Sequence, residues 1–276
     1  MAKKRQKAKL ELTRRDFLVM AGTAVGSAVF AQAVTTGPLS PFATLRQRQV
    51  AGREGDLGLA TTGKRWGMVI SLDRCIGCEY CLRACCATND VNPDKPWNIV
   101  AEEKSSAGQT FFFSRPCLHC QEAPCVEVCP VRATYVRDDG LVVMDYDRCI
   151  GCRYCEVACP YDARKFNWEE RTDENPYVPT WGTPEVDRRP RGVVEKCTFC
   201  IHRIDAGLAK GLTPGVDFEA TPACVSICPV GARTFGDLHD PESPVAQLVA
   251  NTPTLRLREE LGTEPSVYYI PPKEGL

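Results

Sequence analysis

The spacing of the cysteines constrains this chain more than any other feature of its sequence. Sixteen of the seventeen cysteines fall into four groups of four, which we number as motifs one to four in chain order. A fold for this chain has to accommodate all four groups. The motifs are Cys75-x2-Cys78-x2-Cys81-x3-Cys85, Cys117-x2-Cys120-x4-Cys125-x3-Cys129, Cys149-x2-Cys152-x2-Cys155-x3-Cys159 and Cys197-x2-Cys200-x23-Cys224-x3-Cys228.

Motif three has the spacing with which bacterial ferredoxins bind [4Fe–4S] clusters. In such a motif, three thiolates from a tight loop bind one cluster, and the last cysteine binds the second cluster of a pair. A proline follows the last cysteine of motifs two, three and four. We therefore expect that cysteine to begin a helix, because proline is tolerated in a first helical turn. Together the motifs predict four [4Fe–4S] clusters on sixteen cysteines.

Two other uses of clustered cysteines are the alternatives. Zinc sites use four-ligand groups, commonly two Cys-x2-Cys pairs, and runs of three closely spaced cysteines do not suit one tetrahedral ion. A pure disulfide framework uses cysteines in pairs, and the count of seventeen is odd. Both alternatives fit the spacing less well than iron–sulfur clusters do.

An internal repeat predicts how the motifs pair. Nine residues from Asp73 recur 74 residues later, from Asp147, with eight identities. Between motifs two and three, residues 133–144 predict a strand, an Asp-Gly turn and a second strand. We expect motifs two and three to form one unit, with motifs one and four paired around it. The predicted fold class is α+β, with two duplicated bacterial-ferredoxin-like units, one inserted in the other, and long loop insertions.

This pairing divides the chain into five parts. The 23-residue gap within motif four is expected to form an extra surface loop. The expected parts are a signal peptide (1–33), a linker (34–65), a discontinuous ferredoxin-like unit with motifs one and four (66–110 and 167–236), a contiguous ferredoxin-like unit with motifs two and three (111–166), and a C-terminal tail at a subunit interface (237–276).

The first 33 residues have the pattern of an export signal. Basic residues lead into Arg14-Arg15-Asp16-Phe17-Leu18, and no charged residue occurs over residues 17–34. This pattern resembles a twin-arginine signal, although the usual basic residue at position 19 is replaced by Val19. That route exports folded proteins, so we expect the chain in the periplasm, at the outer face of the cytoplasmic membrane. An uncleaved membrane anchor is the alternative interpretation of the same segment.

The four motifs in this order resemble the four-cluster electron-transfer subunits of membrane-associated molybdopterin oxidoreductases. That family serves reductases for dimethyl sulfoxide, polysulfide and tetrathionate. The resemblance covers residues 66–270 and includes the segments 196–200 and 235–237. It implies a chain that is not an enzyme on its own. Such a chain relays single electrons between a multi-span quinone-reactive membrane subunit and a catalytic molybdopterin-type subunit of a respiratory oxidoreductase, with a sulfur compound as a candidate substrate.

The resemblance also implies which cysteines share a cluster. Cys86, the seventeenth cysteine, is then a small buried residue, and a register in which Cys86 replaces Cys85 is the alternative. The four implied ligand sets are set A (Cys75, Cys78, Cys81, Cys228), set B (Cys85, Cys197, Cys200, Cys224), set C (Cys117, Cys120, Cys125, Cys159) and set D (Cys129, Cys149, Cys152, Cys155).

Cations beside the motifs are candidates for raising the potentials of the clusters, whose charge is negative. We expect about half of these cations to be solvated surface charges instead. The candidates are Arg74, Arg83, Arg132, Arg148, Arg153 and Lys196.

Charge and inserts bear on the partners. The formal net charge is −1, and no polybasic stripe follows residue 33, so nucleic acid is not an expected partner. The chain is expected to associate with the membrane through its partner subunits. A free-standing soluble polyferredoxin is the alternative function, and the long inserts argue against it.

Overall fold

The computed structural model describes residues 63–105 and 108–272. All of these residues belong to one compact unit, Gly52–Leu276. The predicted signal peptide and most of the predicted linker lie outside the described residues. Within the described ranges, no helix has the length and hydropathy needed to cross a bilayer.

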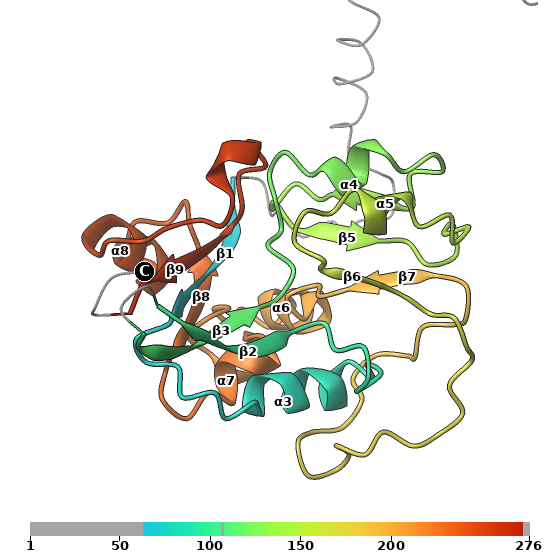
Figure 1. Ribbon diagram of the computed structural model, residues 1–276, viewed down its shortest axis with the longest axis horizontal. Helices are drawn as coiled ribbons and strands as arrows, with labels where there is room; N and C mark the ends of the chain where they lie inside the picture. Colours follow the sequence, from blue (N-terminus) through green and yellow to red (C-terminus); the bar gives the residue numbers. More distant parts are fainter. Residues whose placement is uncertain (1–62, 106–107, 273–276) are drawn as a thin grey trace, which may run out of the picture. The chain divides into compact units, whose positions relative to one another are not determined.

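Short helices and strands joined by long loops make up the described chain (Figure 1). In chain order they are β1 (Trp66–Ser71), α3 (Tyr80–Thr88), β2 (Ile99–Lys104), β3 (Thr110–Arg115), α4 (Pro124–Glu127), β4 (Thr134–Val136), β5 (Val142–Met144), α5 (Tyr154–Val157), β6 (Arg164–Phe166), β7 (Val194–Lys196), α6 (Ile201–Ala209), η1 (Phe218–Ala220), α7 (Ala223–Ser226), β8 (Arg233–Asp237), α8 (Pro244–Asn251), η2 (Glu259–Leu261) and β9 (Val267–Ile270).

The largest sheet joins segments from both ends of the described chain. β1 lies in its centre, antiparallel to β8 and parallel to β9 (Figure 1). All residues of β1 are buried. Met68, Phe235 and Tyr269, one from each strand, have no solvent exposure. Burying side chains of this size stabilises the fold by roughly 2 kcal/mol each, so the C-terminal tail is part of the core.

Three further antiparallel ladders of two strands lie within the described residues: β2 with β3, β4 with β5, and β6 with β7. The predicted hairpin over residues 133–144 is confirmed, because Tyr135 of β4 pairs with Val143 of β5. Gly140 in the turn has a φ of +81°, a conformation that glycine adopts without a steric penalty. The ladders place motifs two, three and four at the ends of short strands.

The helices that carry cysteines differ from the prediction. The expectation that the last cysteine of a motif begins a helix is wrong. In motifs two, three and four the last cysteine instead comes just after a four-residue helix, and the proline, which has no N–H, follows it in a turn. In motif one, Cys85 lies inside α3. In motif two, the N–H of Ala133 donates to the Sγ of Cys129 at 3.2 Å and leads into β4. The helices α4, α5 and α7 each contain the third cysteine of a motif, namely Cys125, Cys155 and Cys224.

The 23-residue gap in motif four is not a plain surface loop, so that prediction is also wrong. It contains α6 and η1, which pack on each other. A Cβ at Gly207 would lie 2.3 Å from the Cβ of Ala220, so only glycine permits this close packing. Ile201, Ile204 and Leu208 recur at helical spacing, and Ile204 is fully buried.

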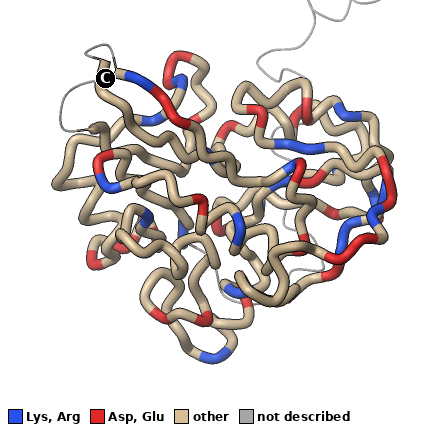
Figure 2. Tube along the Cα trace, turned by 60° about the horizontal axis from the view of Figure 1, so that its bottom comes forward, with Lys and Arg blue, Asp and Glu red and all other residues tan. Residues whose placement is uncertain are grey.

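The long insertion between β6 and β7, residues 167–193, is fixed by ion pairs. Arg188 Nε lies 2.8 Å from a carboxylate oxygen of Asp90, and Arg171 also pairs with Asp90. Arg189 Nε lies 2.6 Å from Glu195 in β7. Figure 2 shows acidic and basic residues interspersed along the described trace. These ion pairs, together with a hydrogen bond from Asn175 to the carbonyl oxygen of Cys86, hold the insertion to α3 and the residues after it.

Candidate iron–sulfur sites

Set A encloses a cavity beside β1 and β8. The loop before α3 closes around it through Gly77, whose φ is +70° and whose Cβ, if present, would lie 2.3 Å from the ring of Phe112. Asn98 Nδ2 donates to the Sγ of Cys81 at 3.2 Å, a contact that stabilises negative charge on sulfur. All four cysteines of the set line this one cavity, namely Cys75, Cys78, Cys81 and Cys228.

Set B is assembled from α3, the loop before α6, and α7. Burial, followed by repulsion from the neighbouring Cys197, Cys86, Cys200 and Cys224, raises the pKa of Cys85 well above its usual value. Asn89 Nδ2 lies 3.5 Å from the Sγ of Cys200, as a donor. The structure therefore brings all four cysteines of set B within electrostatic reach of one another.

Set C joins motif two to the end of motif three. Burial, followed by repulsion from Cys117, Cys125 and Cys159, raises the pKa of Cys120 to about 12. Thr263, in the C-terminal tail, hydrogen-bonds to Cys120 and acts in the opposite direction. All four cysteines of set C thus lie together, with the tail beside them.

Set D combines α5 and the loop before it with the end of motif two. Cys155 in α5 interacts electrostatically with Cys129, the last cysteine of motif two. Cys149 and Cys152 lie in the loop that leads into α5. Cys152 is exposed, whereas the other cysteines are buried or partly buried.

Neighbouring sets also lie within electrostatic reach of each other. Cys224 of set B is affected by Cys81 of set A. Cys197 of set B is affected by Cys117 of set C. Cys155 of set D is affected by Cys125 of set C. These electrostatic interactions link set A to set B, set B to set C, and set C to set D.

The donor chemistry fits iron–sulfur clusters. All seventeen cysteines lie in the described residues and are free thiols. Within residues 63–105 and 108–272, no three His, Cys, Asp or Glu side chains are close enough to hold a single metal ion. A cluster of four irons and four sulfides is larger than one ion, so its four thiolates stand further apart than the ligands of a zinc ion.

Cys86 points away from set B. It is fully buried, and its charged neighbours are Arg171, Glu195 and Arg189, which belong to the insertion and β7. Burial raises the pKa of Cys86 to about 12. The Cys86 thiol therefore lies in the contact between α3 and the insertion, whereas Cys85 faces the other cysteines of set B.

The cations that the sequence singled out are mostly at the surface. Lys196 alone is fully buried, at 0% exposure. Burial lowers the pKa of the Lys196 ammonium, and the thiolates of Cys117 and Cys197 act in the opposite direction. Arg83 is partly buried, and four of the candidates are exposed: Arg74, Arg132, Arg148 and Arg153.

Two buried cations were missed. Arg164 is 1% exposed and Arg233 is 5% exposed. Burial alone lowers the pKa of each guanidinium, but nearby cysteine thiolates outweigh burial and the pKa is raised. Both arginines directly follow a Cys-Pro-x-x-Ala segment. This repeated position in the sequence could have identified both arginines as candidates.

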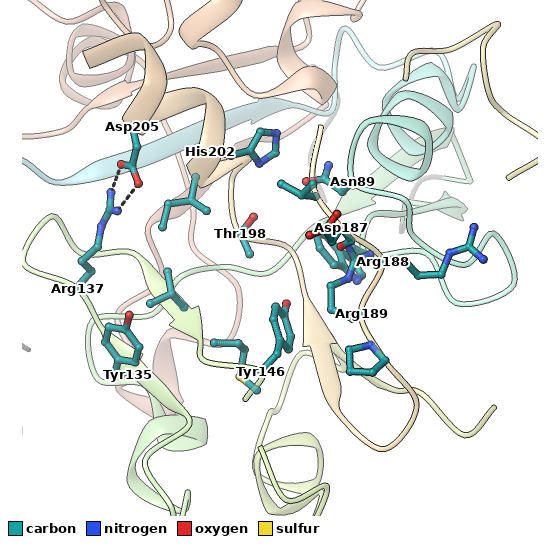
Figure 3. Close-up of a pocket in the computed structure, with 16 residues that line it drawn as sticks. Asn89, Tyr135, Arg137, Tyr146, Asp187, Arg188, Arg189, Thr198, His202 and Asp205 are labelled. Carbon is teal, nitrogen blue, oxygen red and sulfur yellow. Dashed lines mark hydrogen bonds and ion pairs between the residues drawn. The ribbon is translucent and has the colours of Figure 1, made fainter. Parts of the chain in front are cut away.

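A separate cavity of about 490 Å³ lies between the β4–β5 hairpin and α6 (Figure 3). Tyr135 and Tyr146 line it from the hairpin side, and His202 lines it from α6. Across it, Arg137 Nη1 lies 2.8 Å from Asp205 Oδ2, an ion pair that ties the hairpin to α6. No cysteine lines this cavity, so we assign no cluster to it.

Comparison with known proteins identifies the class. Two models described as a 4Fe-4S dicluster domain match residues 108–175 and 148–232. Together with the cysteine sets, they define an electron-transfer protein that holds four [4Fe–4S] clusters.

Curated relatives identify the family. A putative dimethyl sulfoxide reductase iron–sulfur subunit of Halobacterium salinarum is 46% identical over 221 residues, covering 74% of this chain and 78% of the relative. One chain of the polysulfide reductase of Wolinella succinogenes is 38% identical over 218 residues, covering 77% and 97%. The menaquinone reductase iron–sulfur cluster-binding subunit of Nitratidesulfovibrio vulgaris is 41% identical over 237 residues, covering 76% and 90%.

The chain therefore belongs to the family of iron–sulfur subunits of respiratory oxidoreductases. The resemblance drawn from the motifs is thereby confirmed. The chain is an electron-transfer subunit and not a catalytic enzyme on its own.

Proposed function

We propose that sets A to D hold the four clusters in one row and that this chain relays electrons along the row, between a quinone-reactive membrane subunit and a catalytic molybdopterin-type subunit. When bound, each cluster accepts and releases one electron at a time. The observation that carries the proposal is that one cysteine of each set lies within electrostatic range of a cysteine in the next set: Cys81 and Cys224, Cys117 and Cys197, and Cys125 and Cys155. Hydrogen bonds through Arg233 and Asn98 also link Cys224 of set B to Cys81 of set A. These interactions support the order A, B, C, D.

Equivalent positions in the motifs support a nested duplication, which fits this order. His119 and Phe199 occupy the same place in motifs two and four, both with positive φ (+44° and +54°), and their rings stack at 3.9 Å. Glu79 and Arg153 occupy the same place in motifs one and three, with φ of +61° and +62°. We therefore propose a unit formed by 111–166, inserted in a second unit formed by 66–110 and 167–236.

The two ends of the row carry exposed apolar residues. Around set D, Ile150, Tyr154 and Val157 are 63%, 64% and 86% exposed, next to the exposed Cys152. Around set A, Ile76 is 56% exposed. Apolar side chains exposed next to a redox centre are suited to docking another subunit. We propose that one partner docks at each end.

Export remains part of the proposal. The paired Arg14 and Arg15 and the uncharged stretch after them support a twin-arginine signal and a periplasmic location. Replacing both arginines with lysine is expected to leave the protein in the cytoplasm with its iron still bound. Periplasmic protein at the wild-type level in this variant would contradict the export route.

The partners are tested by isolating the tagged chain without oxygen from membranes of its own organism. The proposal predicts co-purification with a molybdenum-containing subunit and a multi-span membrane subunit. A quinol analogue, or the substrate of the catalytic subunit, is then expected to change the oxidation state of the clusters. Recovery of the chain alone, loaded with iron and exchanging electrons with several soluble enzymes, would favour a free-standing polyferredoxin instead.

A further inference from the structure

Three buried cations in the described part of the chain have no carboxylate partner. They are Arg164, Lys196 and Arg233, which are 1%, 0% and 5% exposed. Other buried arginines are paired: Arg137 contacts Asp139 and Asp205, and Arg189 contacts Glu195. A buried charge without a counter-ion costs several kcal/mol, and a negative group close to each of the three would offset that cost.

Arg164 faces sets C and D. Its Nη2 donates to the Sγ of Cys125 at 3.0 Å and to Thr134 Oγ1 at 2.8 Å. Its Nη1 lies 3.0 Å from the Sδ of Met144. Cys155 of set D is also among its charged neighbours. Arg164 therefore stands at the junction between set C and set D.

Arg233 makes the same kinds of contact at the other end of the row. Its Nη1 lies 3.5 Å from the Sγ of Cys224 and 3.5 Å from the Sδ of Met68. Its Nη2 donates to Asn98 Oδ1 at 2.7 Å, and Asn98 in turn donates to the Sγ of Cys81. Cys224 belongs to set B and Cys81 to set A, so Arg233 stands at the junction between them.

The two arginines are equivalent in sequence and in structure. Each is the first residue of a strand, β6 or β8. Each contacts a cysteine at the third position of a motif, a methionine sulfur and a hydroxyl group, which is Thr134 for Arg164 and Ser114 for Arg233. The arrangement at the junction of sets A and B is therefore repeated at the junction of sets C and D.

Lys196 occupies the remaining junction. Its Nζ donates to the carbonyl oxygens of Val142 and Cys197, the latter at 2.7 Å. Cys117 of set C and Cys197 of set B are among its charged neighbours. The three buried cations are therefore distributed one to a junction: A–B, B–C and C–D.

We propose that Arg233, Lys196 and Arg164 are the counter-ions of the electron path, each raising the reduction potential of the two clusters beside it. The inference rests on the proposed order of the sets. Reduction adds negative charge to a cluster, and a nearby cation stabilises the reduced form. The interaction weakens with distance, so each cation acts mainly on its two neighbours.

The test neutralises one cation at a time in the complex isolated without oxygen: Arg164→Gln, Lys196→Gln and Arg233→Gln. Four reduction potentials are measured by potentiometric titration with EPR detection, together with the iron content. Arg164→Gln is expected to lower two of the four potentials, and Arg233→Gln the other two. Lys196→Gln is expected to lower one potential from each pair. This crossed pattern needs no prior assignment of signals to cysteines.

Charge-preserving and charge-neutral controls separate charge from structure. Arg164→Lys, Arg233→Lys and Lys196→Arg are expected to keep the potentials close to those of the unaltered protein. The double variant Arg189→Gln/Glu195→Gln removes a buried ion pair without changing net charge, and is expected to leave all four potentials in place. If a glutamine variant loses iron, the charge-preserving variant decides: restored iron supports the counter-ion role, and iron still missing overturns it.

Two failures are distinguishable. An unaltered protein with far fewer than about sixteen iron atoms per chain would contradict the proposed function itself. An unaltered protein with four clusters, but with glutamine variants whose potentials stay in place or all fall equally, would overturn the counter-ion inference alone.

Discussion

The cations beside the cysteine sets and those of the insertion at 167–193 are neutralised in different ways. In the insertion, Arg171 and Arg188 share the carboxylate of Asp90, and Arg189 pairs with Glu195. Beside the cysteine sets, Arg164 and Arg233 contact sulfur and have no carboxylate partner in the described residues. One region carries its own counter-charge, whereas the other depends on thiolates and their clusters. We therefore expect the ion pairs of the insertion to persist without iron, and the packing around Arg164 and Arg233 to depend on the clusters.

Removing the iron acts on only one of the two regions and is expected to have the largest effect on stability. Without clusters, burial keeps most thiols protonated at neutral pH, as the pKa of about 12 at Cys224 indicates, and Arg164 and Arg233 lose their counter-charge. The apoprotein is expected to lose about 5 kcal/mol or more of unfolding free energy. Thermal unfolding followed by circular dichroism measures this loss, and an apoprotein that melts at the temperature of the holoprotein would contradict the account.

A single ligand variant sharpens the comparison. Cys125→Ala removes a proposed ligand of set C and the sulfur that Arg164 contacts. It is expected to lose about four iron atoms per chain, measured by metal analysis, and to melt at a lower temperature.

Cys86→Ala is the matched control for that variant, because Cys86 is also buried but faces the insertion. We expect it to keep all the iron and to cost about 1 kcal/mol of unfolding free energy. The comparison breaks if the Cys86 variant loses a cluster while a Cys85→Ala variant keeps all four.

Asp90→Asn acts on the insertion alone. It removes the carboxylate that Arg171 and Arg188 share, and it is expected to cost about 2 kcal/mol, because both arginines retain some access to water. Denaturant titration of the holoprotein measures the cost. Cluster potentials are expected to stay unchanged, so a shift comparable to that of Arg164→Gln would show that the two regions are not separate.

An exposed ion pair is expected to contribute the least to the unfolding free energy. Lys210 and Glu219 lie 3.0 Å apart with side chains 61% and 68% exposed. Lys210→Gln is expected to change the unfolding free energy by less than about 0.5 kcal/mol, because water and salt screen such pairs. If Lys210→Gln lowers the unfolding free energy as much as Asp90→Asn in the same denaturant titration, burial does not determine how much these ion pairs stabilise the protein.

Local spacing in the sequence predicted the features that depend on neighbouring residues. The cysteine motifs, the hairpin at 133–144 and the family all followed from residue types at fixed intervals. The helices were misplaced, because the turn after the last cysteine is shaped by a hydrogen bond to its sulfur, as at Cys129. The spacing of residue types in the sequence does not predict this hydrogen bond.

Long-range pairing could not be predicted in the same way. β9 pairs with β1 in parallel, with Val267 beside Met68, although the two strands are about two hundred residues apart along the chain. No local pattern in the tail predicts this partner. Arg164 and Arg233 each follow a Cys-Pro-x-x-Ala segment, a repeated position that singles them out but does not reveal what they contact. Only the fold shows that they are buried against Cys125 and Cys224.

The most direct test of the central claim is the iron, zinc and acid-labile sulfide content of the protein isolated without oxygen, combined with EPR of the reduced form. Sixteen thiols in four sets predict about sixteen iron and sixteen sulfide atoms per chain, with spectra of interacting [4Fe–4S] clusters. A colourless protein holding zinc, or one with iron for only one or two clusters, would contradict it.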